Sequence, residues 1–309
     1  MRRAADQLLQ AQTARFGDID PLLPAATAPP EGDVITAALP SGERVAGVVV
    51  RTALEPGSLG SLWSALDVWE LHPLLGMSGG QGMDPLLRQW HRMITRGTIG
   101  PDSACVVTWP TRDAEATRAL LDHGFVPLSS IAVRTGAGSP PAGPAAGSVR
   151  RAGLADAEAV LRLELAELEY SALVGGAIRR PGSTEIKRAS VARHLANDDP
   201  IWLAERSGVA VGMAHCWLSE SEPGSWSAIR LPPGRWGYVN CLSVLPAERG
   251  GGVGQELMAV AHRELDGAGT VGTFLYYHPS NPLSSVFWAR QGYRPLWTTW
   301  EIRPAGALR

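Results

Sequence analysis

Two hydrophobic periods alternate along the second half of the chain, and their order predicts its elements. Apolar runs with period two, or continuous apolar runs between turn residues, predict strands. Apolar positions spaced near 3.6 residues, opened by acidic or capping residues, predict helices. The predicted strands are 148–151, a hairpin at 200–218, 236–244, 272–277 and 296–303, and the predicted helices are 156–170, 184–196, 252–266 and 282–291. This interleaving indicates an α/β (α+β) fold.

A segment rich in glycine, proline and alanine divides the chain. Residues 136–147 read Gly-Ala-Gly-Ser-Pro-Pro-Ala-Gly-Pro-Ala-Ala-Gly, which offers no core positions and is typical of a linker. The length of 309 residues fits two domains of about 150 residues each. We therefore expect one domain at 1–135, the linker at 136–147, and a second domain at 148–309.

Both parts of the chain share one layout. Each has a hairpin around a Ser-Gly turn, at 33–50 and 200–218, followed by a Gly-x-Gly. Each ends in a predicted helix that closes on glycine plus an aromatic residue. This agreement indicates an internal duplication. The first part shows no clear opening strand or long helix, so we expect a copy truncated at its N-terminal side.

Composition and charge argue against several classes of protein. The formal net charge is −2 and no basic cluster is present, which disfavours nucleic-acid binding. The apolar runs are too short for a membrane helix, and the start lacks the apolar region of a signal peptide. Cys105, Cys216 and Cys241 match neither a disulfide framework nor a zinc pattern, and the histidines lack metal-ligand spacing. We expect a cytoplasmic protein without a metal, and we attribute its single lysine, Lys187, to coding bias.

A glycine-dense turn joins the predicted strand 236–244 to the predicted helix 252–266. The turn contains Arg249-Gly-Gly-Gly252-Val-Gly254. Its glycines let the backbone approach a ligand, Arg249 supplies positive charge, and the helix directs its first N–H groups at the same point. No Lys-Ser/Thr pair follows, so the turn is not a Walker loop. The pattern predicts a cradle for a phosphate group.

The order of hairpin, strand, glycine loop, helix, strand, helix and Gly-aromatic resembles a GNAT (GCN5-related) N-acetyltransferase domain over residues 148–305. The resemblance implies two tandem GNAT domains, each a mixed, mainly antiparallel sheet flanked by helices. It also implies acetyl-CoA, or a related acyl-CoA, as co-substrate. The residues that match the family's cofactor-binding positions are Leu242, Val244, Arg249, Gly250, Gly252, Val253, Gly254, Gln255, Asn281 and Trp288.

Two positions depart from the family pattern. Trp288 stands where a tyrosine often protonates the departing thiolate, and Tyr238 stands where a glutamate often acts as base. We expect catalytic contributions from Tyr238, from His278 with its suitable pKa, and from Asn240, which would orient water or substrate. The hydroxyl of Ser284, or that of its neighbour Ser285, is an alternative acid.

The first part resembles the family less closely. Its loop at 77–82 carries Met77 where the family has glutamine or arginine, and Pro85 is expected in the first turn of the next helix. We interpret it as a degenerate GNAT domain. The chain as a whole is expected to acylate a small-molecule amine by direct attack on the thioester, as a monomer or homodimer with no nucleic-acid or membrane partner. Two alternatives stay open: a non-catalytic acyl-CoA sensor or scaffold, and a GNAT-like domain with another acyl acceptor.

Overall fold

The first half of the chain contains a long helix followed by a hairpin and an alternation of strands and helices. The structure is a computed structural model that describes residues 2–136 and 149–309, so all but the first residue of the predicted linker lies outside it. The elements of the first half are α1 (Arg2–Ile19), β1 (Asp33–Ala38), β2 (Arg44–Ala53), the 3-10 turn η1 (Leu59–Leu62), β3 (Asp67–Leu74), α2 (Gly79–Ile94), β4 (Ser103–Pro110), α3 (Ala114–Asp122) and β5 (Val126–Thr135).

The second half closely follows the elements predicted for it. They are β6 (Val149–Arg151), α4 (Ala157–Leu173), α5 (Ser183–Ala196), β7 (Ile201–Arg206), β8 (Val209–Ser221), the 3-10 turn η3 (Ser227–Ile229), β9 (Gly234–Val244), α6 (Val253–Gly267), β10 (Gly272–Tyr277), α7 (Pro282–Arg290) and β11 (Arg294–Ile302). The mixed sheet flanked by helices confirms the predicted fold class.

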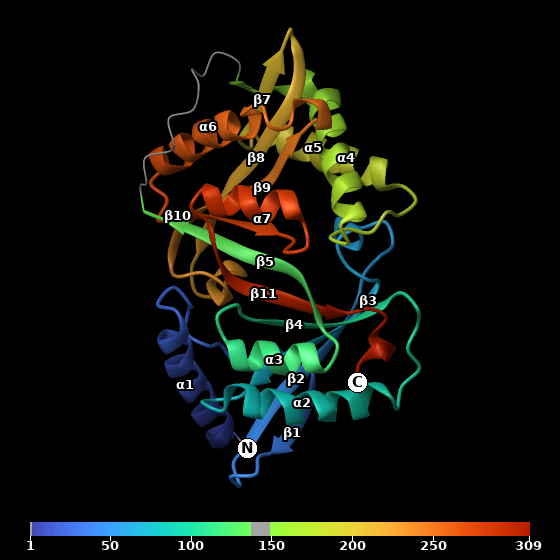
Figure 1. Ribbon diagram of the computed structural model, residues 1–309, viewed down its shortest axis with the longest axis vertical. Helices are drawn as coiled ribbons and strands as arrows, with labels where there is room; N and C mark the ends of the chain where they lie inside the picture. The colour runs from blue at the N-terminus through green and yellow to red at the C-terminus, as the bar shows by residue number, and fades with distance from the viewer. Residues whose placement is uncertain (1, 137–148) are drawn as a thin grey trace.

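All strands of the described residues form one sheet, in the order β1-β2-β3-β4-β11-β5-β10-β9-β8-β7-β6 (Figure 1). Each half contributes a hairpin, a third antiparallel strand and a parallel neighbour, which are β1 to β4 in the first half and β7 to β10 in the second. The last strand of each half then crosses over. β5 pairs with β10 of the second half, and β11 pairs with β4 of the first. The predicted division into two domains stays a prediction, but the sheet itself runs through both halves.

Strands of the second half are covered by helices on both faces. Along β7, Ile201 and Leu203 pack with residues of α4 and α5, whereas Trp202 and Ala204 pack with residues of α6. Side chains alternate between the two faces of a strand, so a strand covered on both sides must be apolar throughout. This explains why β7 reads as a continuous apolar run.

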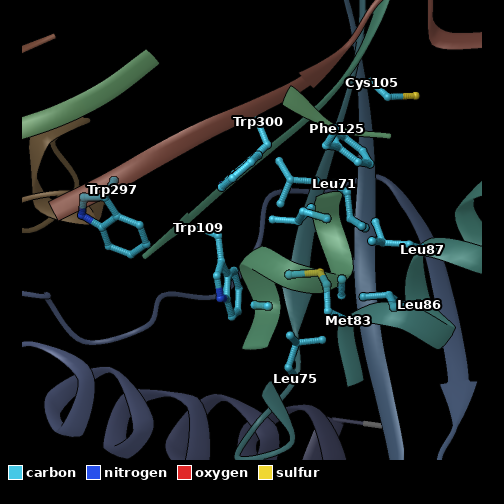
Figure 2. Packing of buried hydrophobic residues seen from close by; sticks show 14 of the residues in the cluster. Leu71, Leu75, Met83, Leu86, Leu87, Cys105, Trp109, Phe125, Trp297 and Trp300 are labelled. Carbon is cyan, nitrogen blue, oxygen red and sulfur yellow. The ribbon is translucent and has the colours of Figure 1, made fainter. Parts of the chain in front are cut away.

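The crossover of β11 places two tryptophans in the core of the first half. Trp297 and Trp300 lie in one cluster with Trp109, Phe125 and leucines of β3 and α2 (Figure 2). Phe16 of α1 meets the rings of both Trp109 and Trp297 edge-on, with ring centroids 5.5 and 5.6 Å apart. The C-terminus therefore lies beside the first half (Figure 1).

Two expectations for the first half were wrong. It does contain a long helix, α1, whose apolar positions are few because it buries only a narrow side that includes Gln12 and Phe16. In addition, α2 begins at Gly79, so Pro85 lies in its second turn and not in its first. None of the described helices combines the length and the hydrophobicity that a membrane span requires.

Candidate active site

The predicted site lies where β9 and β10 separate. Their parallel pairing runs from Trp236 opposite Gly272 to Val239 opposite Leu275, and among the described residues it stops there, although β9 continues to Val244. On the other edge of β9, the pairing with β8 shifts register at Asn240, which is the extra residue of a β-bulge. The bulge bends β9 away from β10 and leaves its backbone groups after Val239 open toward the gap.

The glycine turn at the end of β9 has the geometry that the phosphate cradle requires. Gly252 precedes α6 at φ 87°, a left-handed conformation that favours glycine. A β-carbon on Gly254 would lie 3.3 Å from the Phe287 ring, a tight contact that glycine avoids. The Arg249 side chain is held at the turn, because its Nε donates to the Val244 carbonyl at 3.0 Å and its guanidinium lies 4.8 Å from the centre of the Tyr170 ring.

One cavity of about 900 Å³ joins this cradle to a second, more aromatic end. Every predicted cofactor-binding residue borders it, and so do the three residues expected to contribute to catalysis. These are Tyr238, Asn240, Leu242, Val244, Arg249, Gly250, Gly252, Val253, Gly254, Gln255, His278, Asn281 and Trp288. The structure thus brings together residues from the β9 strand, the α6 turn and the α7 segment. Their individual roles stay predictions.

Two of the predicted cofactor-binding residues also have structural tasks. The Asn281 side chain caps α7 by accepting from the N–H groups of Leu283 and Ser284. Trp288 is 8% exposed and packs edge-on against Phe287, with centroids 5.0 Å apart. Both residues therefore shape the wall of the cavity whether or not they touch the cofactor.

Tyr238 and His278 differ in their suitability as a base. Burial raises the pKa of the Tyr238 phenol, which stacks on Phe274 with centroids 4.7 Å apart, so the phenol keeps its proton. The His278 Nδ1 atom lies 2.7 Å from the Leu128 carbonyl oxygen, to which it donates. The other ring nitrogen of His278, Nε2, is then the one that can accept a proton.

Of the two serines considered as acids, Ser284 borders the cavity. The Ser285 hydroxyl donates to the Asn281 carbonyl at 3.0 Å, which commits its proton to the helix.

Sequence reasoning missed the charged residues of the cavity. Glu164 and Glu167 of α4 and Lys187 of α5 all border it. Lys187 Nζ donates to Glu164 at 3.0 Å, and His215 Nδ1 lies 3.1 Å from the other oxygen of Glu164. Two features of the sequence could have indicated these residues. The glutamates interrupt the apolar positions of a predicted helix, and Lys187 is the single lysine in a chain whose other basic residues are arginines.

The first half of the chain closes the aromatic end of the cavity. Trp63 comes just after η1. Its ring lies nearly parallel to the His278 ring, with centroids 6.5 Å apart, and Lys187 Nζ lies 5.3 Å from the centroid of the Trp63 ring. Arg180 of the second half holds this segment, because its guanidinium donates to the Ser61 carbonyl at 2.6 Å and pairs with Asp102 at 2.8 Å. The aromatic end of the cavity therefore depends on both halves.

Comparison with known proteins agrees with this geometry. Residues 164–293 match the family model of the acetyltransferase (GNAT) family. This segment is therefore a GNAT acetyltransferase domain. The match identifies the chain as an acyltransferase. No curated protein matches the sequence significantly.

Solved structures share the GNAT fold with the chain. A GCN5-related N-acetyltransferase from Sphaerobacter thermophilus aligns with a TM-score of 0.58 at 14% identity, over 97% of this chain and 93% of that one. A GCN5-related N-acetyltransferase from Ralstonia eutropha JMP134 aligns at 24% identity over 48% of this chain and 92% of that one, with a TM-score of 0.38. The PaiA N-acetyltransferase from Thermoplasma acidophilum, solved with coenzyme A, aligns at 14% identity over 50% of this chain and 97% of that one, with a TM-score of 0.37. At 14% identity, the likeness to the Sphaerobacter thermophilus structure concerns the fold alone.

The GNAT-like loop of the first half is filled by its own chain. Gln12 of α1 donates to the Pro73 carbonyl at 3.1 Å and accepts from the Leu75 N–H at 2.8 Å. Its side chain thus forms hydrogen bonds with the backbone groups at the end of β3. A β-carbon on Gly79 would lie 2.4 Å from the Arg15 guanidinium. Helix α1 thus covers this loop with its own side chains.

A cluster of three side chains beside the cavity has some features of a metal site. One ligand atom each from His194, Asp199 and His215 lie within 4.8 Å of one another. However, His194 Nδ1 is hydrogen-bonded to Asp199 at 2.7 Å, and His215 Nδ1 faces Glu164. Each of the two histidines thus directs its Nδ1 atom at a carboxylate, which leaves Nε2 as the ring nitrogen that a metal ion could bind. His215 Nε2 is buried without a hydrogen-bond partner among the described residues. The expectation of no metal stays a prediction.

Proposed function

We propose that the chain transfers an acetyl group, or a related acyl group, from acyl-CoA to the amine of a small molecule. The observation that carries the proposal is one continuous cavity, which runs from the cradle at α6 past the open edge of β9 to the aromatic end beneath Trp63. An acyl-CoA with its pyrophosphate at the cradle would extend its thioester along β9. The aromatic end would then receive the amine.

The chemistry favours direct attack by the amine. Cys241 borders the cavity, but burial raises the pKa of its thiol well above the ordinary value, so a thiolate nucleophile is not available. In a direct mechanism the amine nitrogen attacks the thioester carbonyl while N–H groups of the open β9 edge, between Leu242 and Val244, polarise its oxygen. The protein then has to remove a proton from the amine and supply one to the thiolate.

Binding and turnover test the proposal separately. Acetyl-CoA is titrated into the wild type and a Gly252→Trp variant by calorimetry, and free CoA thiol is then followed with a panel of small amines. We expect saturable binding that the variant loses, and thiol release that depends on one or more amines. The control is Gly267→Trp at the exposed far end of α6, where a β-carbon has open space. Amine-independent thiol release by the wild type would contradict an N-acyltransferase.

A non-catalytic acyl-CoA sensor is the second candidate. The observation that favours it is Trp288, an indole without a transferable proton at the position where the family often has its acid. It predicts acetyl-CoA binding that the Gly252→Trp variant loses, with no thiol release for any amine of the panel.

A further inference from the structure

The charged groups of the cavity divide into a neutralised pair and one separate carboxyl group. Glu164 and Lys187 are 2% and 5% exposed, and each is the other's partner at 3.0 Å. Glu164 also accepts from His215. The charge of Lys187 stabilises the ionised form of Glu164, so this carboxylate has little tendency to take up a proton.

Glu167 is the separate carboxyl group. It follows Glu164 by three residues on α4, so both side chains lie on the side of the helix that faces the cavity. Its hydrogen-bond partner among the described residues is the Ser171 hydroxyl, one turn further along, which donates to Oε1. A carboxylate accepts several hydrogen bonds, so Glu167 retains acceptor capacity toward the cavity.

The other residues around Glu167 complete an environment for an ammonium group. Tyr238 and Trp63 border the same cavity, and His278 lies against Trp63, held by its bond to Leu128. An alkyl ammonium group is attracted both to a carboxylate and to the faces of aromatic rings.

We propose that Glu167 is the general base that removes a proton from the ammonium group of the acyl acceptor. This inference rests on the proposed N-acyltransferase function. An N–H bond of the ammonium breaks and its proton moves to the Glu167 carboxylate. The freed nitrogen lone pair attacks the thioester carbonyl carbon, a C–N bond forms and the C–S bond breaks. The second amine proton ends on the departing sulfur, so the products are the amide and CoA thiol, and Glu167 returns its proton to solvent.

The acid–base properties of Glu167 agree with this role. Burial raises its pKa above the ordinary carboxyl value, against the opposing influence of the Ser171 hydrogen bond and the Lys187 charge. A base whose pKa lies closer to neutral transfers protons more effectively near pH 7. The raised pKa of Tyr238 makes its phenol a poor competitor for this task.

The size of the expected effect follows from the acceptor. An alkyl amine of pKa about 10.4 is only about one part in 10³ neutral at pH 7. An enzyme without its base must wait for this neutral fraction, and general-base catalysis typically contributes about 10² to 10⁴ in rate. We therefore expect Glu167→Gln to lower kcat/KM for alkyl amines at pH 7 by about 10² or more.

The test compares Glu167→Gln with a matched control, Glu169→Gln, on the exposed side of the same helix. Hydroxylamine serves as a nucleophile that is mostly neutral at pH 7. We expect Glu167→Gln to bind acetyl-CoA normally, to lose activity toward alkyl amines, to keep most activity toward hydroxylamine, and to regain rate as the pH approaches the pKa of the amine. Glu167→Asp should retain part of the activity and serves as the second variant if the glutamine form does not fold.

Three results would overturn the inference. Glu167→Gln with a wild-type rate and pH profile, in a wild type that transfers acyl groups, would refute the role of Glu167 alone. A large loss in His278→Asn, combined with a wild-type rate in Glu167→Gln, would assign the base to His278. A wild type that releases no thiol with any amine would refute the proposed function, and the role of Glu167 would fall with it.

Discussion

Replacing Glu164 by glutamine should strongly destabilise the protein, because the substitution leaves Lys187 charged and buried. Burial alone would raise the pKa of Glu164, but the hydrogen bond from His215 and the charge of Lys187 outweigh it and lower the pKa to about 2. The difference from the ordinary value of 4.5 corresponds to roughly 3 kcal/mol of stabilisation of the ionised form. Breaking a buried ion pair typically costs about 3–5 kcal/mol, which agrees with this magnitude.

The assay is urea unfolding, followed by tryptophan fluorescence, of the wild type and Glu164→Gln between pH 7 and pH 3. A carboxyl group whose folded pKa is lowered contributes stability above its unfolded pKa and loses that contribution as the pH falls toward the folded value. The gap between the two proteins should therefore be about 3 kcal/mol at pH 7 and shrink below about pH 4.5.

Two further variants sharpen this test. Glu169→Gln, which is exposed on the same helix, should change stability by no more than about 0.5 kcal/mol. Adding Lys187→Met to Glu164→Gln removes the unpaired charge and should recover part of the loss, because apolar groups often replace a buried ion pair at little cost. A gap below about 1 kcal/mol at pH 7, or one that does not change with pH, would refute the reasoning.

Two other predictions concern the relation between the halves. Arg180→Ala removes bonds to a carbonyl and a carboxylate of the first half, each worth about 1.5–3 kcal/mol when charged groups take part. We expect Arg180→Ala to raise KM for the amine about tenfold or more while acetyl-CoA affinity stays unchanged. The control is Arg179→Ala, at an exposed position. A lower acetyl-CoA affinity with an unchanged amine KM would contradict this role of Arg180. Because Gln12 and Arg15 fill the loop of the first half, calorimetry should give one acetyl-CoA per chain. A second site that survives Gly252→Trp would show that α1 can move aside.

The elements of the second half could be predicted because local signals encode them. The left-handed turn at Gly252, the Asn281 cap and the apolar period of each helix are properties of a few neighbouring residues. The cradle was predictable for the same reason, since its strand, turn and helix are consecutive in sequence. All predicted site residues except Ser285, an alternative acid, consequently border one cavity.

Features that depend on distant pairings could not be predicted. Nothing near Trp297 or Trp300 indicates that β11 joins the sheet of the first half, because strand order is set by side-chain packing over the whole chain. Helix α1 carries too few apolar residues to show its period, yet Gln12 and Phe16 bury one side of it. The ion pair of Glu164 and Lys187 joins two helices, and only their packing makes either charge tolerable in the interior.

The strand exchange explains why a first half with a filled loop still belongs to the active site. β5 lies between β11 and β10, so the last strand of the first half is the direct neighbour of the strand that leads to His278. Leu128 of β5 consequently accepts from His278 Nδ1 and fixes which ring nitrogen carries the hydrogen. η1 adds Trp63 above the same ring. A second half without the first would lose one of the two hydrogen-bonded neighbours of β10, the partner of His278 and the Trp63 cover of the aromatic end together. The first half thus supplies structure that the catalytic half lacks, which is a sufficient physical reason for both to be present in one chain.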